Sequence, residues 1–126
     1  MVKRLLVVDD EETILFAIDR YFSRIGFSVD CARELEEAEA LATYTSYDLV
    51  IADLSLSENG STEGLEIIRY VRRTCPTARV ILLTAHGSPV AEKEAFRRGV
   101  DVFLHKPSPL AEIARIATAL MEVSEA

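Results

Sequence analysis

Five short apolar runs alternate with amphipathic stretches along this chain, and the alternation limits the folds that it can adopt. The runs are rich in Val, Leu and Ile and contain little polar alternation, which is typical of strands buried on both faces of a parallel sheet. They cover residues 5–8, 27–32, 48–52, 79–83 and 102–104. Each is followed by a stretch of helical length whose apolar residues recur every three or four positions: 12–25, 34–45, 63–74, 89–98 and 109–123. Five strand–helix units predict a single α/β domain over residues 1–126, with right-handed crossovers, helices on both faces of the sheet and no output domain in this chain.

Residues at the expected helix ends support these boundaries. Gly26 and Gly99 follow the first and fourth helical stretches, where glycine commonly ends a helix. Ser88 before Pro89 predicts an N-cap with proline in the first turn, and Pro109 is expected in the first turn of the last helix. The first helix is expected to bury Ile14, Ile18, Tyr21, Phe22 and Ile25. The fourth helix is expected to bury Val90, Ala91, Ala95 and Phe96.

The composition excludes several classes of protein. The formal net charge is −7, and affinity for a nucleic-acid backbone depends on Lys and Arg, so we expect no nucleic-acid binding by this domain. The net negative charge is more compatible with a bound divalent cation than with a nucleic acid. Cys31 and Cys75 are too few and too far apart for a disulfide scaffold or a zinc ribbon, and Cys31 is expected to be a buried thiol. The chain has no signal peptide and no apolar run near the roughly 18 residues of a membrane span, which predicts a soluble domain in a reducing compartment.

Charged and hydroxyl side chains follow four of the five predicted strands. Asp9 and Asp10 come after the first strand, and Asp53, Thr84 and Lys106 come after the third, fourth and fifth. Because the carboxyl ends of parallel strands share one edge of the sheet, we expect these side chains to meet there. The carboxylates would form an oxygen site suited to Mg²⁺, and an aspartate can attack phosphorus to give an aspartyl phosphate. The alternative is that the aspartates cap helices and the lysine is an ordinary surface residue.

Four strings in this order resemble the receiver domain of two-component response regulators. They are VVDDEE (7–12), IADL (51–54), LLTAHG (82–87) and FLHKPS (103–108). Each string alone is weak, but the set satisfies spacing and chemistry together, and the resemblance covers about residues 3–123. It implies a flavodoxin-like fold, a doubly wound five-stranded parallel sheet of order 2-1-3-4-5 with five helices.

The resemblance also implies roles for individual residues. Asp53 would accept a phosphoryl group from a phosphohistidine of a partner histidine kinase or histidine phosphotransfer protein. Asp10 would bind Mg²⁺ directly and Asp9 through water, with further ligands from Asp53 and the backbone carbonyl of Ser55. Such a protein assists only its own phosphorylation and dephosphorylation and is not an enzyme with a separate substrate.

Three residues would connect the acceptor to the output surface. Thr84 would be the switch hydroxyl that bonds the phosphoryl group, and Lys106 its cationic partner, preceding a cis bond to Pro107. Phe103 matches the aromatic switch position of the family, although it fits a packed core aromatic equally well. The surface that changes would be formed by the fourth helix, fifth strand and fifth helix, through which the chain could also form a self-dimer. The resemblance suggests a cytoplasmic location.

The segment after Asp53 departs from the family pattern. The family usually has Met and Pro where Leu56 and Ser57 stand, and a glycine eight positions after the acceptor. Here Gly64 is eleven positions after Asp53, which indicates a three-residue insertion. The longer polar loop could change access to the site and the phosphoryl lifetime, or it could be a tolerated surface insertion.

Other interpretations of the chain stay open. It could be a receiver-like protein-binding module that does not use phosphorylation, or a small phosphatase or flavin protein of similar topology. A zinc site at His86 and His105 lacks ligand spacing, so surface histidines are expected instead. The pairs Arg72–Arg73 and Arg97–Arg98 are interpreted as solvated helix faces.

Overall fold

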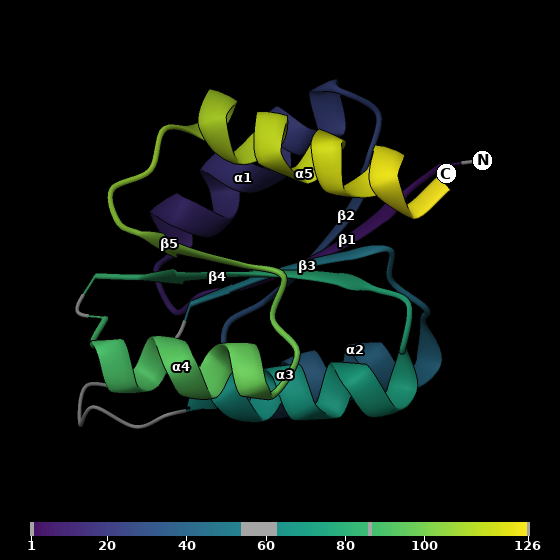
Figure 1. Ribbon diagram of the computed structural model, residues 1–126. Coiled ribbons are helices and arrows are strands. Elements are labelled where there is room, and N and C mark those ends of the chain that lie inside the picture. Colours follow the sequence, from purple (N-terminus) through teal and green to yellow (C-terminus); the bar gives the residue numbers. More distant parts are fainter. Residues whose placement is uncertain (1, 54–62, 86, 126) are drawn as a thin grey trace.

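The computed structural model of the protein describes residues 2–53, 63–85 and 87–125. Strands and helices alternate along the chain (Figure 1). The strands are β1 (Arg4–Val8), β2 (Ser28–Ala32), β3 (Leu49–Asp53), β4 (Arg79–Thr84) and β5 (Val102–His105). The helices are α1 (Glu12–Arg24), α2 (Leu35–Tyr44), α3 (Glu63–Thr74), α4 (Pro89–Arg97) and α5 (Leu110–Glu125). Every element predicted from the sequence is present, with ends that differ by no more than two residues.

All five strands are parallel and hydrogen-bonded in the order β2-β1-β3-β4-β5. The chain moves outward from β1 to β2 and then continues on the other side of β1 with β3, so the strand order reverses between β1 and β3. In open sheets of this kind, ligands bind beyond the carboxyl ends of the strands at that reversal. The predicted flavodoxin-like fold is confirmed.

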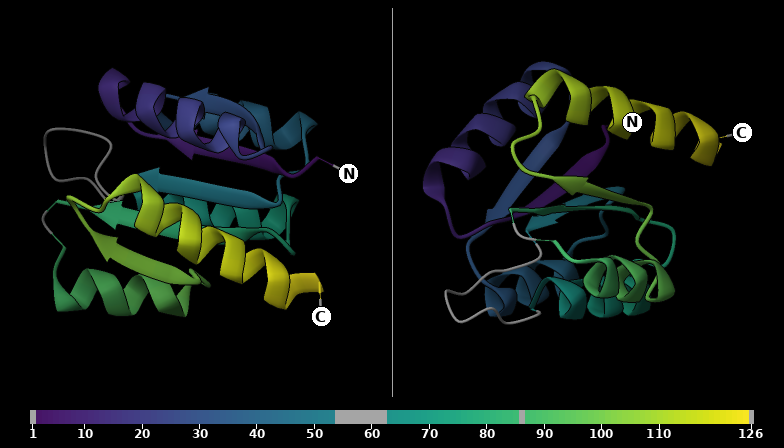
Figure 2. Two further views of the ribbon diagram at one scale, coloured as in Figure 1. Left: turned by 90° about the horizontal axis from the view of Figure 1, so that it is seen from above. Right: turned by 60° about the vertical axis from the view of Figure 1, so that its left-hand side comes forward.

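Two hydrophobic cores lie on opposite faces of the sheet, because successive strand residues point to opposite faces. Leu6 and Val8 of β1 belong to the core beneath α2, α3 and α4, and Leu5 and Val7 to the core beneath α1 and α5. The same alternation continues in β3 and β4. Figures 1 and 2 show the resulting three layers, with α1 and α5 on one face and the other three helices on the other.

The predicted helix ends are present for local reasons. Gly26 and Gly99 both have φ of +105°, a conformation that side chains with a Cβ rarely adopt. After Gly26, the amide of Phe27 donates to the carbonyl of Phe22 at 3.0 Å, closing the end of α1. At the start of α4, the Ser88 hydroxyl accepts from the amide of Ala91 at 3.1 Å, as its N-cap position predicts.

Helix α4 differs from its sequence prediction in the face that it buries. Ala95 is fully buried, but Val90 and Phe96 are 80% and 48% exposed. Only a narrow stripe of α4 therefore contacts the sheet, and two large apolar side chains face outward. Ile25, just beyond α1, is also exposed rather than buried. Periodicity cannot show how closely α4 approaches the sheet, and it extended the first helix to Ile25, which is the C-cap residue of α1.

Arg72 was predicted to be solvated, but in the structure its guanidinium is bonded to the protein. Its guanidinium donates to the carbonyl of Gly99 at 2.7 and 3.1 Å, to Pro76 at 3.2 Å, to Ala78, and to the carboxylate of Asp101 at 3.0 Å. These partners belong to the α3–β4 and α4–β5 connections, so one side chain joins both. Among the described helices, none has the length and apolar character required to cross a membrane.

Candidate functional site

Parallel strands deliver the predicted site residues to one edge of the sheet. Asp53 and Thr84 are the last residues of β3 and β4, Asp9 directly follows β1, and Lys106 directly follows β5. The sequence separation between Asp9 and Lys106 is 97 residues, and their side chains are in contact. Asp9, Asp53 and Thr84 are the buried polar residues of the described chain, at 2%, 7% and 2% exposure. Burying these groups is costly, so their clustering needs a reason beyond folding.

The Lys106 ammonium connects two of the carboxylates. Its Nζ lies 3.0 Å from Oδ2 of Asp9 and 3.2 Å from Oδ2 of Asp53. The other oxygen of Asp9, Oδ1, accepts from the backbone amide of Glu11 at 2.9 Å, immediately before α1. Asp9 is therefore fixed from both sides and does not serve as an N-cap, since Glu11 occupies that position. The Lys106 amide also donates to the Thr84 carbonyl at 2.7 Å, joining the ends of β4 and β5.

Burial and charge act in opposite directions on Lys106. Burial lowers its pKa, but hydrogen bonds and charges from Asp9 and Asp53 outweigh the burial and raise the pKa above its usual value of 10.5. The ammonium is therefore charged at neutral pH. Among the described residues, the cluster of Asp9, Asp10 and Asp53 has ion pairs with one cation, Lys106, which leaves a local excess of negative charge.

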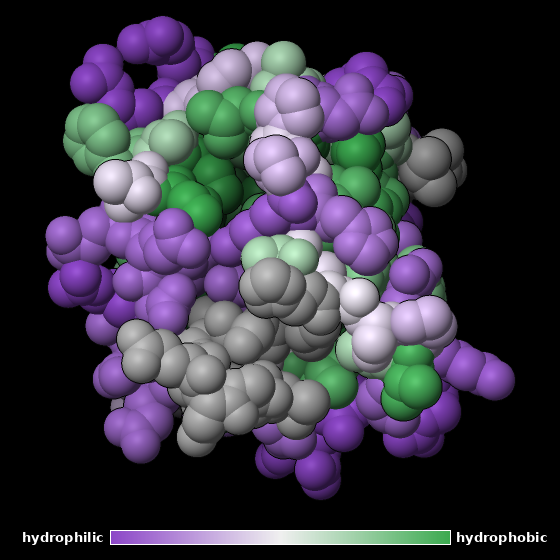
Figure 3. All heavy atoms as spheres, turned by 90° about the vertical axis from the view of Figure 1, so that its left-hand side faces the viewer, coloured by the Kyte–Doolittle hydropathy of each residue, from purple (hydrophilic) through white to green (hydrophobic). Residues whose placement is uncertain are grey.

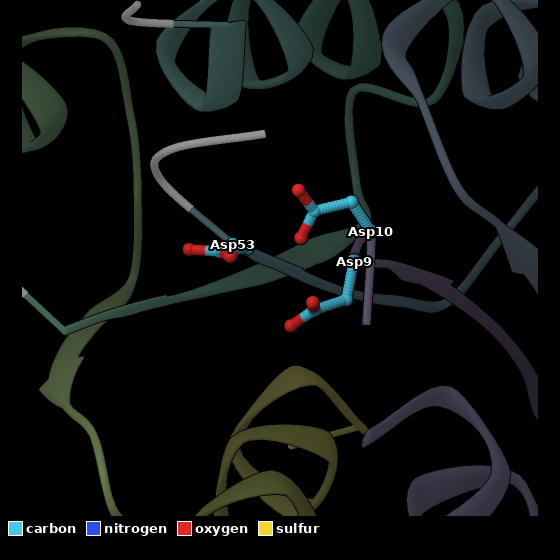
Figure 4. A group of neighbouring side chains, drawn as sticks. All are labelled: Asp9, Asp10 and Asp53. Atoms are coloured by element: carbon cyan, nitrogen blue, oxygen red, sulfur yellow. The ribbon is translucent and has the colours of Figure 1, made fainter. Parts of the chain in front are cut away.

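Three carboxylates converge at the carboxyl ends of β1 and β3. One oxygen each from Asp9, Asp10 and Asp53 lies within 4.8 Å of the others, and Figure 4 shows the three carboxylates directed toward a shared space. Asp10 is exposed, whereas the other two are buried, so the space is open on one side. The donors are all oxygens, as hard divalent cations prefer, and a cation would offset the excess negative charge. The cluster can therefore hold a divalent metal ion.

Thr84 and Phe103 both lie against Gly87, and the sequence did not predict this shared contact. A Cβ built on Gly87 would lie 2.6 Å from Cγ2 of Thr84 and 3.0 Å from Cε1 of Phe103. Both side chains thus pack against the same backbone position. The Phe103 ring is half-buried against the core beneath α4 and lies 5.7 Å from the ring of exposed His105, in an edge-to-face arrangement. The glycine in LLTAHG was visible in the sequence, but its two neighbours come from strands that only the fold brings together.

An apolar cavity of about 510 Å³ adjoins the site on the side of α1 and α5. Its lining includes Ile14 of α1, Leu110 of α5, and both Lys106 and Pro107. Figure 3, which looks onto the carboxyl edge of the sheet, shows hydrophobic surface gathered in its upper part, next to a hydrophilic band. The charged site therefore has an apolar cavity next to it.

The remaining predicted residues have different outcomes. Ser55, the three-residue insertion and His86 lie outside the described residues. The peptide bond between Lys106 and Pro107 is cis, as the resemblance implied. Cys31 is half-buried rather than buried, and burial together with nearby acids raises the pKa of its thiol to about 11. That thiol is protonated at neutral pH and is a poor nucleophile.

Three comparisons with known proteins agree with the geometry. The chain is 32% identical over 123 residues to the transcriptional regulatory protein ResD of Bacillus subtilis, an alignment that covers 97% of this chain and 50% of ResD. A crystal structure of a response regulator protein from Burkholderia pseudomallei has 31% identity and a TM-score of 0.84, covering 98% of this chain and 71% of that one. It contains a phosphorylated aspartic acid, a calcium ion and citrate. The solution structure of the beryllofluoride-activated NtrC4 receiver domain dimer has 28% identity and a TM-score of 0.86, covering 98% and 99% of the two chains.

The coverage of the relatives limits what their names imply. This chain spans half of ResD and a quarter of other curated relatives, such as the AlgB regulator of Pseudomonas putida at 25%. The match is thus to a domain that those proteins share. The sequence model of one protein family, the response regulator receiver domain, matches residues 5–118 of this chain. These residues include all five strands except the first residue of β1. The chain belongs to the response regulator receiver domain family of two-component signalling proteins.

Proposed function

We propose that this receiver domain is a phosphorylation-dependent switch in which Asp53 is the phospho-acceptor. The observation that carries the proposal is the contact of the Lys106 ammonium, 3.2 Å from the buried Asp53 carboxylate, within a cluster of three acids. A buried carboxylate beside a fixed cation and a buried hydroxyl is the arrangement needed to hold a transferred phosphoryl group.

Phosphoryl transfer from a partner would proceed by exchange of one bond for another. A carboxylate oxygen of Asp53 forms the bond to phosphorus while the P–N bond of a phosphohistidine breaks, and the leaving imidazole retains the electron pair and takes up a proton. The donor would be a histidine kinase or a histidine phosphotransfer protein. The apolar cavity beside Lys106 supports docking of such a partner close enough to reach Asp53.

The acidic cluster supports Mg²⁺ as the bound metal. Asp9, Asp10 and Asp53 would hold the ion, with the Ser55 carbonyl as a further ligand, and Mg²⁺ bound there would neutralise charge on the carboxylates and the incoming phosphoryl oxygens. Lys106 would then counter the charge on another phosphoryl oxygen, since its ammonium already lies between Asp9 and Asp53. In this role the chain assists its own phosphorylation and dephosphorylation only.

The test of this function is phosphorylation by a small donor. Incubation with Mg²⁺ and acetyl phosphate is expected to add one phosphoryl group to the intact mass, and removal of Mg²⁺ with EDTA is expected to prevent the gain. No gain despite measurable Mg²⁺ binding would point to restricted access to Asp53. No gain and no Mg²⁺ binding would instead support a receiver-like binding module that does not use phosphorylation.

Signal transmission would depend on Thr84 and Phe103. The phosphoryl group would draw the Thr84 hydroxyl toward it, and the packing of Thr84 and Phe103 around Gly87 provides a route to β5. The changed surface would be that of α4, β5 and α5, and the outward-facing Val90 and Phe96 of α4 support a self-dimer there. The added charge must favour one of two existing states of this surface.

We expect the Thr84→Ala variant to accept the phosphoryl group but to respond weakly. A hydrogen bond to a charged group is worth about 1.5–3 kcal/mol, so its loss should shift the two-state equilibrium by roughly 10- to 150-fold. The measurement is the change in amide chemical shifts of β5 and α5 when beryllofluoride is added. Thr84→Ser, which keeps the hydroxyl, is the control and should respond like the parent. An undiminished response in Thr84→Ala would show that Thr84 does not couple the site to this surface.

A further inference from the structure

A second cavity lies far from the phospho-acceptor and is lined entirely by arginines. It has a volume of about 450 Å³ and lies between the later turns of α3 and α4. We call it the arginine cavity, and its lining residues are Arg69, Arg72, Arg73, Arg97 and Arg98. Both helices run from the carboxyl edge of the sheet back toward the opposite edge, as Figure 1 shows, so the cavity lies on the side away from Asp53. Five of the chain's 14 Lys and Arg residues meet here, in a chain of net charge −7.

Neighbouring acids offset only part of this positive charge. The pairs are Asp101 with Arg72, Glu94 with Arg97 and with Arg98, and Glu66 with Arg98. Asp101 is shared with Arg79, and Glu94 is shared between two arginines. Arg69 and Arg73 have no hydrogen bond or ion pair with any described residue and are exposed. Five cations thus face three acids, which leaves an excess of two positive charges.

The fold alone does not account for this arrangement. Arg69 and Arg73 are four residues apart on α3 and lie on one face of the helix, where two like charges destabilise it by a few tenths of a kcal/mol. A cation in the last turn is favoured by the negative end of the helix dipole, which explains Arg73. Arg69 lies more than one turn from the end of α3, so the dipole offers it little compensation. A bound anion would compensate both residues.

We propose that the arginine cavity binds a small molecule that carries two or more phosphate groups. Guanidinium groups bind phosphate through paired N–H donors, and the donors of Arg69 and Arg73 are free of acid partners in the described structure. A volume of about 450 Å³ suits a compound the size of a nucleotide. The site is concave and local, and the net charge of −7 opposes binding of an extended nucleic acid.

Arg72 and Arg98 would frame the site rather than provide its affinity. Arg72 is committed to three backbone carbonyls and Asp101, and Arg98 to Glu66 and Glu94. Their positions are therefore fixed before a ligand arrives. The variants that test the proposal leave both unchanged, so that the fold is preserved.

Calorimetric titration with inorganic pyrophosphate in metal-free buffer of low ionic strength tests the proposal. We expect saturable binding with one site per chain, weakened at least about tenfold in the double variant Arg69→Gln/Arg73→Gln, because two charge-assisted contacts are lost. The matched control is Arg20→Gln/Arg24→Gln. It removes the same charge from exposed arginines with the same spacing on α1 and should change the affinity by less than about twofold.

Amide chemical shifts of the unsubstituted protein locate the ligand independently of any variant. Pyrophosphate should shift amides in the second half of α3 and the end of α4, and the Asp53→Asn variant should bind it equally well. Shifts confined to the carboxyl edge of the sheet, absence of saturable binding, or equal weakening in both double variants would each overturn the proposal. None of these outcomes depends on whether Asp53 is phosphorylated.

Discussion

The Asp53→Asn variant is expected to incorporate no phosphoryl group from acetyl phosphate in the presence of Mg²⁺, whereas the unsubstituted chain incorporates one. An amide oxygen is a far weaker nucleophile than a carboxylate, so a site with one acceptor loses the reaction completely. Asparagine has nearly the same shape, and Lys106 keeps its contact with Asp9 at 3.0 Å, so the fold should persist. Intact mass spectrometry measures the result directly.

The Asp10→Asn variant is the matched control for this experiment. It makes the same change of carboxylate to amide within the same cluster, but at an exposed position that does not contact Lys106. We expect it to bind Mg²⁺ more weakly and still to accept one phosphoryl group when Mg²⁺ is raised. A mass gain in Asp53→Asn would mean that another residue is the acceptor. Equal loss of the mass gain in both variants at every Mg²⁺ concentration would contradict the assignment of Asp53 as the nucleophile, because either substitution would then act in the same way on the whole cluster.

The fold could be predicted from the sequence because burial on both faces leaves a strong pattern. β3 is buried at all five positions, and the four apolar residues with which it begins are typical of a strand covered by helices on both sides. The candidate site followed in part from the same pattern, since the carboxyl ends of all parallel strands, with the acids, hydroxyl and amine that follow them, lie at one edge of the sheet. That Lys106 contacts Asp9 across 97 residues is a consequence of strand order, which the resemblance to receiver domains supplied.

What the sequence could not predict depends on distances between elements. The shared contact of Thr84 and Phe103 with Gly87 requires the separation of β4 from β5 and the path of the following connection. The exposure of Val90 and Phe96 depends on how closely α4 approaches the sheet. Neither quantity has a periodic signal in the chain.

Arg72 is the clearest example of a residue whose importance is hidden in the sequence. It looks like one of several basic residues at the end of an amphipathic helix. In the structure it provides donors to the carbonyls of Gly99, Pro76 and Ala78 and to Asp101. The carboxylate of Asp101 also accepts from the amide of Val80 at 2.8 Å, so Arg72 indirectly supports the start of β4.

Replacing Arg72 with Met is therefore expected to lower the free energy of unfolding by about 2–4 kcal/mol, a large share of the stability of a small domain. Methionine preserves most of the aliphatic packing, so the loss comes from the carbonyls that lose the Arg72 donors and from a half-buried Asp101 that keeps its ion pair with Arg79 but loses the one with Arg72. Urea denaturation measures the change, and an unchanged m-value checks that unfolding remains two-state. Arg73→Met is the control, because Arg73 is exposed and makes no ion pair with described residues, and it should change stability by less than about 0.5 kcal/mol. Equal stability of the two variants would show that the contacts of Arg72 contribute nothing beyond those of a solvated helix residue.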